Sequence, residues 1–140
     1  MIIMYPNLLE QNIYDKDYKG KFLVIGTCIP KLYPKVVRKF EREWKNLVSF
    51  CLEQFHYNQL FSKLFNIISA NDVKKVGFLT VDGSPHCIQM HYVSKFLKRG
   101  LKKDVEFEHY VIRKDGKVFQ VSMEAIDNSK DLSNAGKKLF

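Results

Sequence analysis

The 140-residue sequence is poor in several residue types, with three cysteines, four prolines and one tryptophan. A small, odd number of cysteines argues against a disulfide framework and for thiols that are free, reactive or bound to a metal. No apolar run approaches the roughly 18–20 residues of a membrane span, so we expect no membrane segment. The first residues lack the pattern of a secretory signal, and the predicted location is therefore cytoplasmic.

Apolar residues are plentiful, and the balance of charge is basic. Hydrophobic residues make up 46% of the chain, which predicts one folded domain over residues 1–140 with a single core. The net charge is +8, and basic residues recur at helical spacing in two segments, 31–45 and 95–102. Such stripes attract polyanions such as RNA or a nucleotide, but they are equally typical of a solvated, lysine-rich surface. A protein partner is a further option.

Three short apolar runs, each followed by a helical pattern, dominate the first two thirds of the chain. The runs cover residues 22–25, 47–50 and 76–81, and the helical patterns cover 31–46, 57–68 and about 87–99. Continuous apolar runs are typical of parallel strands buried on both faces, and their alternation with helices predicts right-handed crossovers. We therefore predict an α/β fold, a three-layer Rossmann/flavodoxin-like domain with a mainly parallel sheet.

The C-terminal third has a different pattern of apolar and polar residues. Residues 105–113 alternate between apolar and polar, an Asp-Gly turn follows, and an apolar run returns at 118–121, which predicts a β-hairpin at the edge of the sheet. Ser122 is placed to cap a short helix from Met123 to about Leu132, and we expect the tail after it to be irregular. The predicted organisation is an N-terminal arm (1–20), a core (21–99), the edge hairpin (105–121), and a C-terminal helix with a tail (122–140).

Each cysteine follows one of the three predicted parallel strands. Cys28 comes after the first strand, Cys51 after the second, and Cys87 in the loop after the third. The carboxyl ends of parallel strands share one edge, where open α/β sheets bind ligands, and neighbouring strands lie about 4.8 Å apart. A single cysteine at a strand end is often an apolar filler, but three at equivalent ends favour a metal or a cluster.

Two metal centres suit three thiolates. An iron–sulfur cube on three cysteines keeps one iron open, and a zinc ion with three protein ligands keeps an open position. His86 or His91 would close the site if either supplied a fourth ligand. His109 shares a strand face with Phe107 and Val111, and we expect it to be packed in the core.

These residues also carry a resemblance. The stretches VIGTCIP, VSFCLEQ and VDGSPHC, within residues 21–92, resemble the cysteine motifs of the thiouracil desulfidase (TudS-like) family. The resemblance implies a 4Fe–4S cluster on Cys28, Cys51 and Cys87, with Glu53 as the acid/base and Ser84 positioning the substrate. The family pattern has Pro, Ser and Gly where this chain has Leu52, His86 and Ile88, which indicates a divergent relative with an SPHC loop.

The resulting expectation is an iron–sulfur protein of desulfidase type that removes sulfur from a thiolated base or a related small molecule. Asp82, Gly83 and His86 of the loop after the third strand are the predicted substrate-binding residues, although Asp82 also suits a helix cap or a turn. One alternative is a non-enzymatic cluster- or zinc-binding module that serves a redox or sulfur-transfer partner. Another is a metal-free domain that holds phosphate on the loop 83–87.

Overall fold

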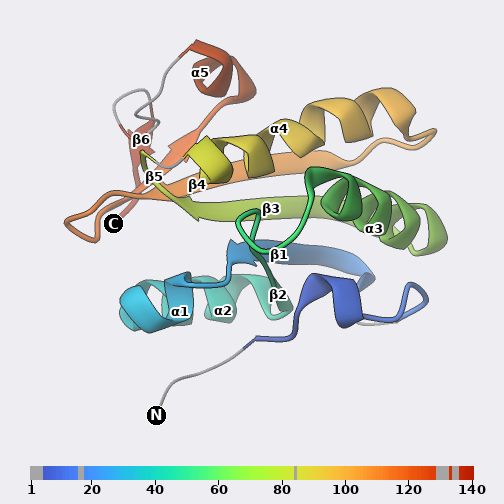
Figure 1. Ribbon diagram of the computed structural model, residues 1–140, viewed down its shortest axis with the longest axis horizontal. Coiled ribbons are helices and arrows are strands. Elements are labelled where there is room, and N and C mark those ends of the chain that lie inside the picture. The colour runs from blue at the N-terminus through green and yellow to red at the C-terminus, as the bar shows by residue number, and fades with distance from the viewer. Residues whose placement is uncertain (1–4, 16–17, 84, 129–132, 134–135) are drawn as a thin grey trace.

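Figure 1 shows the computed structural model of the chain, which describes residues 5–15, 18–83, 85–128, 133 and 136–140. The side chains of residues 85–87 and 128 lie outside this description. None of the described helices is both long and apolar enough to cross a membrane.

The described strands form one sheet in the order β2-β1-β3-β4-β5-β6. The first four in sequence pair in parallel, and β5 and β6 run antiparallel to their neighbours. This arrangement confirms the predicted α/β fold with a C-terminal hairpin. The strands are β1 (Gly20–Gly26), β2 (Leu47–Phe50), β3 (Val73–Val81), β4 (Glu106–Ile112), β5 (Val118–Val121) and β6 (Lys137–Lys138). The helices are η1 (Leu8–Glu10), α1 (Ile29–Leu32), α2 (Pro34–Trp44), α3 (Tyr57–Ala70), α4 (Pro85–Gly100) and α5 (Met123–Asn128).

Helices cover both faces of the sheet and create two apolar layers (Figure 1). Successive side chains of a strand point to opposite faces, so Phe22 and Val24 of β1 pack in the layer that contains α3 and α4. Leu23 and Ile25 pack in the other layer, against α2. The burial of β1 on both faces explains why its sequence is a continuous apolar run.

The predicted helix 31–46 is divided in two. Tyr33, between α1 and α2, has φ −135° and ψ 60°, and Pro34 begins α2. A residue before proline is disfavoured in the helical region, whereas proline itself is well suited to a first helical position. The chain therefore turns at Tyr33, and the inward stripe of α2 consists of Val36, Val37, Phe40 and Trp44.

The end of the chain is more regular than predicted. The Ser122 hydroxyl accepts a hydrogen bond from the amide of Ala125 at 3.1 Å, which confirms its role as a cap for α5. The expectation of an irregular tail was wrong for Lys137–Lys138, which pair with β5, and the Val118 amide donates to the Phe140 carbonyl at 2.7 Å. This pairing satisfies main-chain groups on the outer side of β5, which would otherwise form an open edge.

Candidate functional site

A pocket of about 280 Å³ lies where β1, β2 and β3 end. Cys28, Cys51 and Glu53 line it together, as the sheet topology predicts for residues that follow neighbouring parallel strands. Val81 at the end of β3, Leu32 of α1 and Met90 of α4 complete an apolar wall. The pocket therefore combines two thiols, one carboxylate and a largely apolar lining, which suits a soft metal centre or a small, flat molecule.

The chain after β1 places Cys28 at this edge. The Thr27 amide donates to the Phe50 carbonyl at 3.3 Å, so the ends of β1 and β2 are held side by side. Cys28 then becomes the N-cap residue of α1, where its carbonyl accepts a hydrogen bond from the Leu32 amide at 3.2 Å. The Cys28 residue is exposed, so its thiol is accessible to a ligand.

A tight turn after β2 places Cys51 and Glu53. The carbonyl of Cys51 accepts hydrogen bonds from the amides of Gln54 and Phe55, at 3.2 and 3.0 Å. The chain bends around this carbonyl, so Cys51 is half-buried and Glu53 is exposed at the rim of the same pocket. Glu53 therefore lines the same pocket as the two cysteines while its residue stays exposed.

The third predicted ligand cannot be placed in the same way. The backbone of Cys87 belongs to the first turn of α4, directly after the loop from β3, but the side chains of His86 and Cys87 lie outside the described part of the structure. Ser84 lies outside it entirely. Among the described side chains, no group of three His, Cys, Asp or Glu residues is arranged to hold a metal ion. Because the side chain of Cys87 is not among them, the three-cysteine site stays a prediction.

Asp82 and Gly83 form the described part of the loop after β3. The Asp82 amide donates to the Ile112 carbonyl at 2.9 Å, which extends the pairing of β3 with β4. Its carboxylate accepts hydrogen bonds from both the amide, at 3.3 Å, and the hydroxyl of Ser133. Gly83 has φ +82°, a conformation that glycine adopts without strain. Asp82 thus anchors the C-terminal segment, and a role of either residue in substrate binding stays a prediction.

A buried pair of histidines lies between α4 and β4. The Nδ1 atoms of His91 and His109 are 2.9 Å apart, and the Nε2 atom of His91 is 2.7 Å from the Thr80 hydroxyl oxygen. The Nε2 atom of His109 is 3.2 Å from the hydroxyl oxygen of Ser94. The side chain of His109 is 3% exposed, which confirms its predicted place in the core. Both ring nitrogens of His91 have partners within this network, away from the cysteine pocket.

Burial sets the charge of this pair. It lowers the pKa of His109 to about 4, with a further lowering from the Lys98 ammonium and an opposing effect of Glu108. Burial, together with the neighbouring His109, also holds the pKa of His91 well below 6.5. Both imidazoles are therefore neutral at pH 7. Sequence patterns place His109 in the core but give no sign that it bonds to His91.

A comparison with protein families identifies the class of this domain. The sequence matches the family described as Rossmann-like domain over residues 18–139, and the chain belongs to that family. No curated protein and no solved structure gives a significant match. The family membership agrees with the parallel sheet and with a pocket at the carboxyl ends of its strands.

Proposed function

We propose that this chain is an iron–sulfur protein of desulfidase type. It holds a 4Fe–4S cluster through Cys28, Cys51 and Cys87, and it removes sulfur from a thiolated base or a related small molecule. The observation that supports the proposal is the pocket at the strand ends, which Cys28, Cys51 and Glu53 line together. The resemblance of the three cysteine-bearing stretches to the TudS-like family supports it independently.

The donor set suits the cluster. Thiolates are the usual ligands of iron–sulfur clusters, and Cys28 and Cys51 are both accessible from the pocket. Bound to three cysteines, the cluster would supply one iron with an open position that attracts the sulfur of the substrate. Replacement of a thiocarbonyl sulfur by the oxygen of water yields a carbonyl and hydrogen sulfide, and needs no oxidant or reductant. Glu53 at the rim accepts the proton from the attacking water.

The first test is the metal content of protein prepared without oxygen. We expect equal amounts of iron and sulfide in the wild type, about four of each per chain. We expect a large loss in each of the variants Cys28→Ser, Cys51→Ser and Cys87→Ser. The exposed Ser62→Cys variant, which adds a thiol on α3, is a control for unspecific effects of thiol number. Wild-type protein without iron, sulfide and zinc would refute both the cluster and the zinc alternative, and zinc alone would favour the latter.

The second test separates an enzyme from a carrier. Cluster-containing protein is incubated with 2-thiouracil or thiolated nucleosides, and the loss of thiocarbonyl absorbance is compared with released sulfide. Equal rates of the two support the desulfidase. A stable cluster without turnover supports the alternative, a module that serves a redox or sulfur-transfer partner. If the substrate is RNA, activity falls steeply with added salt, whereas a flat salt profile indicates a small molecule.

A further inference from the structure

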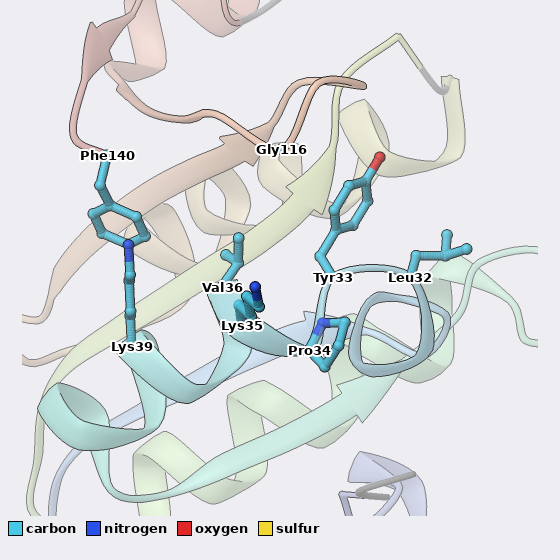
Figure 2. Close-up of a pocket in the computed structure, with 8 residues that line it drawn as sticks. All are labelled: Leu32, Tyr33, Pro34, Lys35, Val36, Lys39, Gly116 and Phe140. Atoms are coloured by element: carbon cyan, nitrogen blue, oxygen red, sulfur yellow. The ribbon is translucent and has the colours of Figure 1, made fainter. Parts of the chain in front are cut away.

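A second and larger pocket, of about 400 Å³, lies between the start of α2 and the turn that joins β4 to β5 (Figure 2). Its walls come from segments far apart in the sequence: the residues around Pro34, the hairpin turn at Gly116, and Phe140 next to β6. Figure 2 shows the side chains of Leu32 and Tyr33 on one side of the pocket and those of Lys39 and Phe140 on the other. The volume is within the range of sites that bind small molecules or a large side chain.

The lining of this pocket is largely apolar, and two of its apolar side chains are unusually exposed. Leu32 is 58% exposed and Phe140 is 38% exposed, which places them among the most exposed large apolar residues of the described chain. Single exposed apolar residues are common on protein surfaces. Here, however, both line one hollow together with Pro34 and Val36, and a continuous apolar hollow is typical of an interaction site.

Two ammonium groups stand at the rim. Lys35 and Lys39 line the pocket and are exposed, and within the described part of the chain neither forms an ion pair with a carboxylate. The outer face of α2 also exposes Arg38 and Arg42. An apolar hollow under unpaired positive charge is complementary to an apolar group flanked by negative charges.

We propose that this pocket docks an acidic segment of a partner protein through one large apolar anchor residue. The anchor fills the hollow against Leu32 and Phe140, and acidic residues on either side of it pair with Lys35 and Lys39. Such an anchor in a pocket, surrounded by polar contacts, is the common arrangement of small protein–protein interfaces.

The surroundings of Phe140 favour a protein over single-stranded nucleic acid. Binding of nucleic acid without sequence preference relies on aromatic rings whose faces are free for bases. The ammonium of Lys39 already lies 4.4 Å from the centre of the Phe140 ring, and the Phe40 ring is 5.7 Å from it. The second aromatic ring of the lining, Tyr33, is half-buried, and its hydroxyl donates to the Lys114 carbonyl at 3.5 Å. The rest of the contact surface, from Leu32, Pro34 and Val36, is aliphatic, which suits an apolar side chain.

Leu32 connects the docking site to the cysteine pocket. Leu32, the last residue of α1, lines both pockets, and Cys28 is the N-cap residue of the same helix. A segment that fills the hollow against Leu32 therefore lies beside one wall of the cysteine pocket. The docking site goes beyond the proposed desulfidase function and does not require a cluster, so it can be tested whether or not the protein holds one.

The test is a selection from a random peptide-display library against the full chain. The affinity of one selected peptide, labelled with a fluorophore, is then measured by fluorescence anisotropy. We expect the selected peptides to share one large apolar residue flanked by Asp or Glu. We expect the double variant Lys35→Glu/Lys39→Glu to weaken binding by about tenfold or more, since like charges then face each other. The matched double variant Lys98→Glu/Lys102→Glu, which alters exposed charges elsewhere, should change it by less than about threefold.

Further variants test whether binding depends on the apolar anchor residue as well as on charge. Replacement of the apolar residue of the peptide by Ser, or Leu32→Ser in the protein, should also weaken binding by about tenfold. Equal effects of the two charge reversals, or a peptide that binds as well without its apolar residue, would overturn the proposal. So would selected peptides without acidic residues. Tighter binding of a labelled RNA oligonucleotide that Lys35→Glu/Lys39→Glu abolishes would assign the surface to nucleic acid instead.

Discussion

His91 and His109 bond to each other through their Nδ1 atoms, 2.9 Å apart, and both side chains are buried. Two neutral imidazoles share one proton in such a contact, so one ring donates and the other accepts. A consistent assignment has Thr80 donating to His91, His91 to His109, and His109 to the hydroxyl of Ser94. The Ser94 hydroxyl then donates to the carbonyl of His91 at 3.0 Å. Each group has a partner as long as the pair carries no net charge.

This pair predicts a loss of stability in mild acid. The folded-state pKa of His109 is about 4, below its ordinary value of 6.5, so the unfolded chain binds the proton more readily. The contribution of neutral His109 to the free energy of unfolding is complete above pH 6.5. It is lost as the pH falls toward 4, at up to about 1.4 kcal/mol per pH unit. We expect a total on the order of 3 kcal/mol from His109 alone, measured by urea unfolding between pH 7.5 and 4.

Two variants test whether the pair causes that loss. His109→Gln removes one titrating group and can still bond to Ser94, so it should flatten the decline of stability below pH 6.5. His56→Gln removes an exposed histidine just before α3, outside this network, and this variant should keep the steep decline of stability below pH 6.5. If both variants respond to acid as the wild type does, other groups determine acid unfolding.

The hydrogen bonds between Asp82 and Ser133 join the loop after β3 to the C-terminal segment, so their loss should destabilise the chain. Ser133 donates both its amide and its hydroxyl to the Asp82 carboxylate, and its side chain is buried. We expect Asp82→Asn and Ser133→Ala each to destabilise the chain by about 1–2 kcal/mol. Both should speed hydrogen exchange of the amides of Val118 and Leu139, which join β5 to the end of the chain.

The two variants differ if Asp82 also binds substrate. An anchoring role alone makes them equivalent in stability and in desulfidase activity. A direct role in substrate binding lowers the activity of Asp82→Asn well below that of Ser133→Ala at equal stability. Unchanged stability in both variants would contradict the anchoring role.

Local patterns predict much of this fold because they follow from burial. The continuous apolar runs in β1, β2 and β3 reflect strands covered on both faces, and the Asp-Gly turn before Val118 fixes the hairpin. The break at Tyr33 was missed although Pro34 signals it, because the apolar stripe of α2 continues across the break. The pairing of Lys137–Lys138 with β5 could not be predicted, since two lysines have no strand pattern and their partner is distant in sequence.

The candidate site likewise has features that the sequence predicts and features that it does not. The meeting of Cys28 and Cys51 in one pocket follows from topology, because strands that run in parallel end at one edge. The contact of His91 with His109 depends on the register of β3 with β4, which pairs Phe78 with His109, and on the rotation of α4 above them. Register and rotation are set by packing over the whole sheet, so a local pattern does not contain them.

The packing around Gly77 predicts a sensitive position in the sheet. A methyl group there would lie 2.7 Å from Cδ1 of Leu23 and 2.7 Å from Cη2 of Trp44, both buried. We expect Gly77→Ala to lower the free energy of unfolding by about 1–3 kcal/mol, because a well-packed layer must shift to admit it. Urea unfolding followed by the fluorescence of Trp44, the single tryptophan, measures this. Gly100→Ala is the control, because its nearest contact is Phe65 at 3.3 Å; equal losses would contradict the packing argument.

Glu53 provides the most direct test of chemistry in the cysteine pocket. Its side chain is exposed at the rim, so Glu53→Gln should leave the fold and the iron content unchanged. Gln has nearly the same shape as Glu but cannot accept a proton at neutral pH, and we expect the rate of sulfide release to fall by about 100-fold or more. Gln54→Ala, at the neighbouring exposed position, is the control and should keep the wild-type rate. A full rate in Glu53→Gln would exclude the carboxylate as the proton acceptor, whereas loss of iron would make it part of the cluster site.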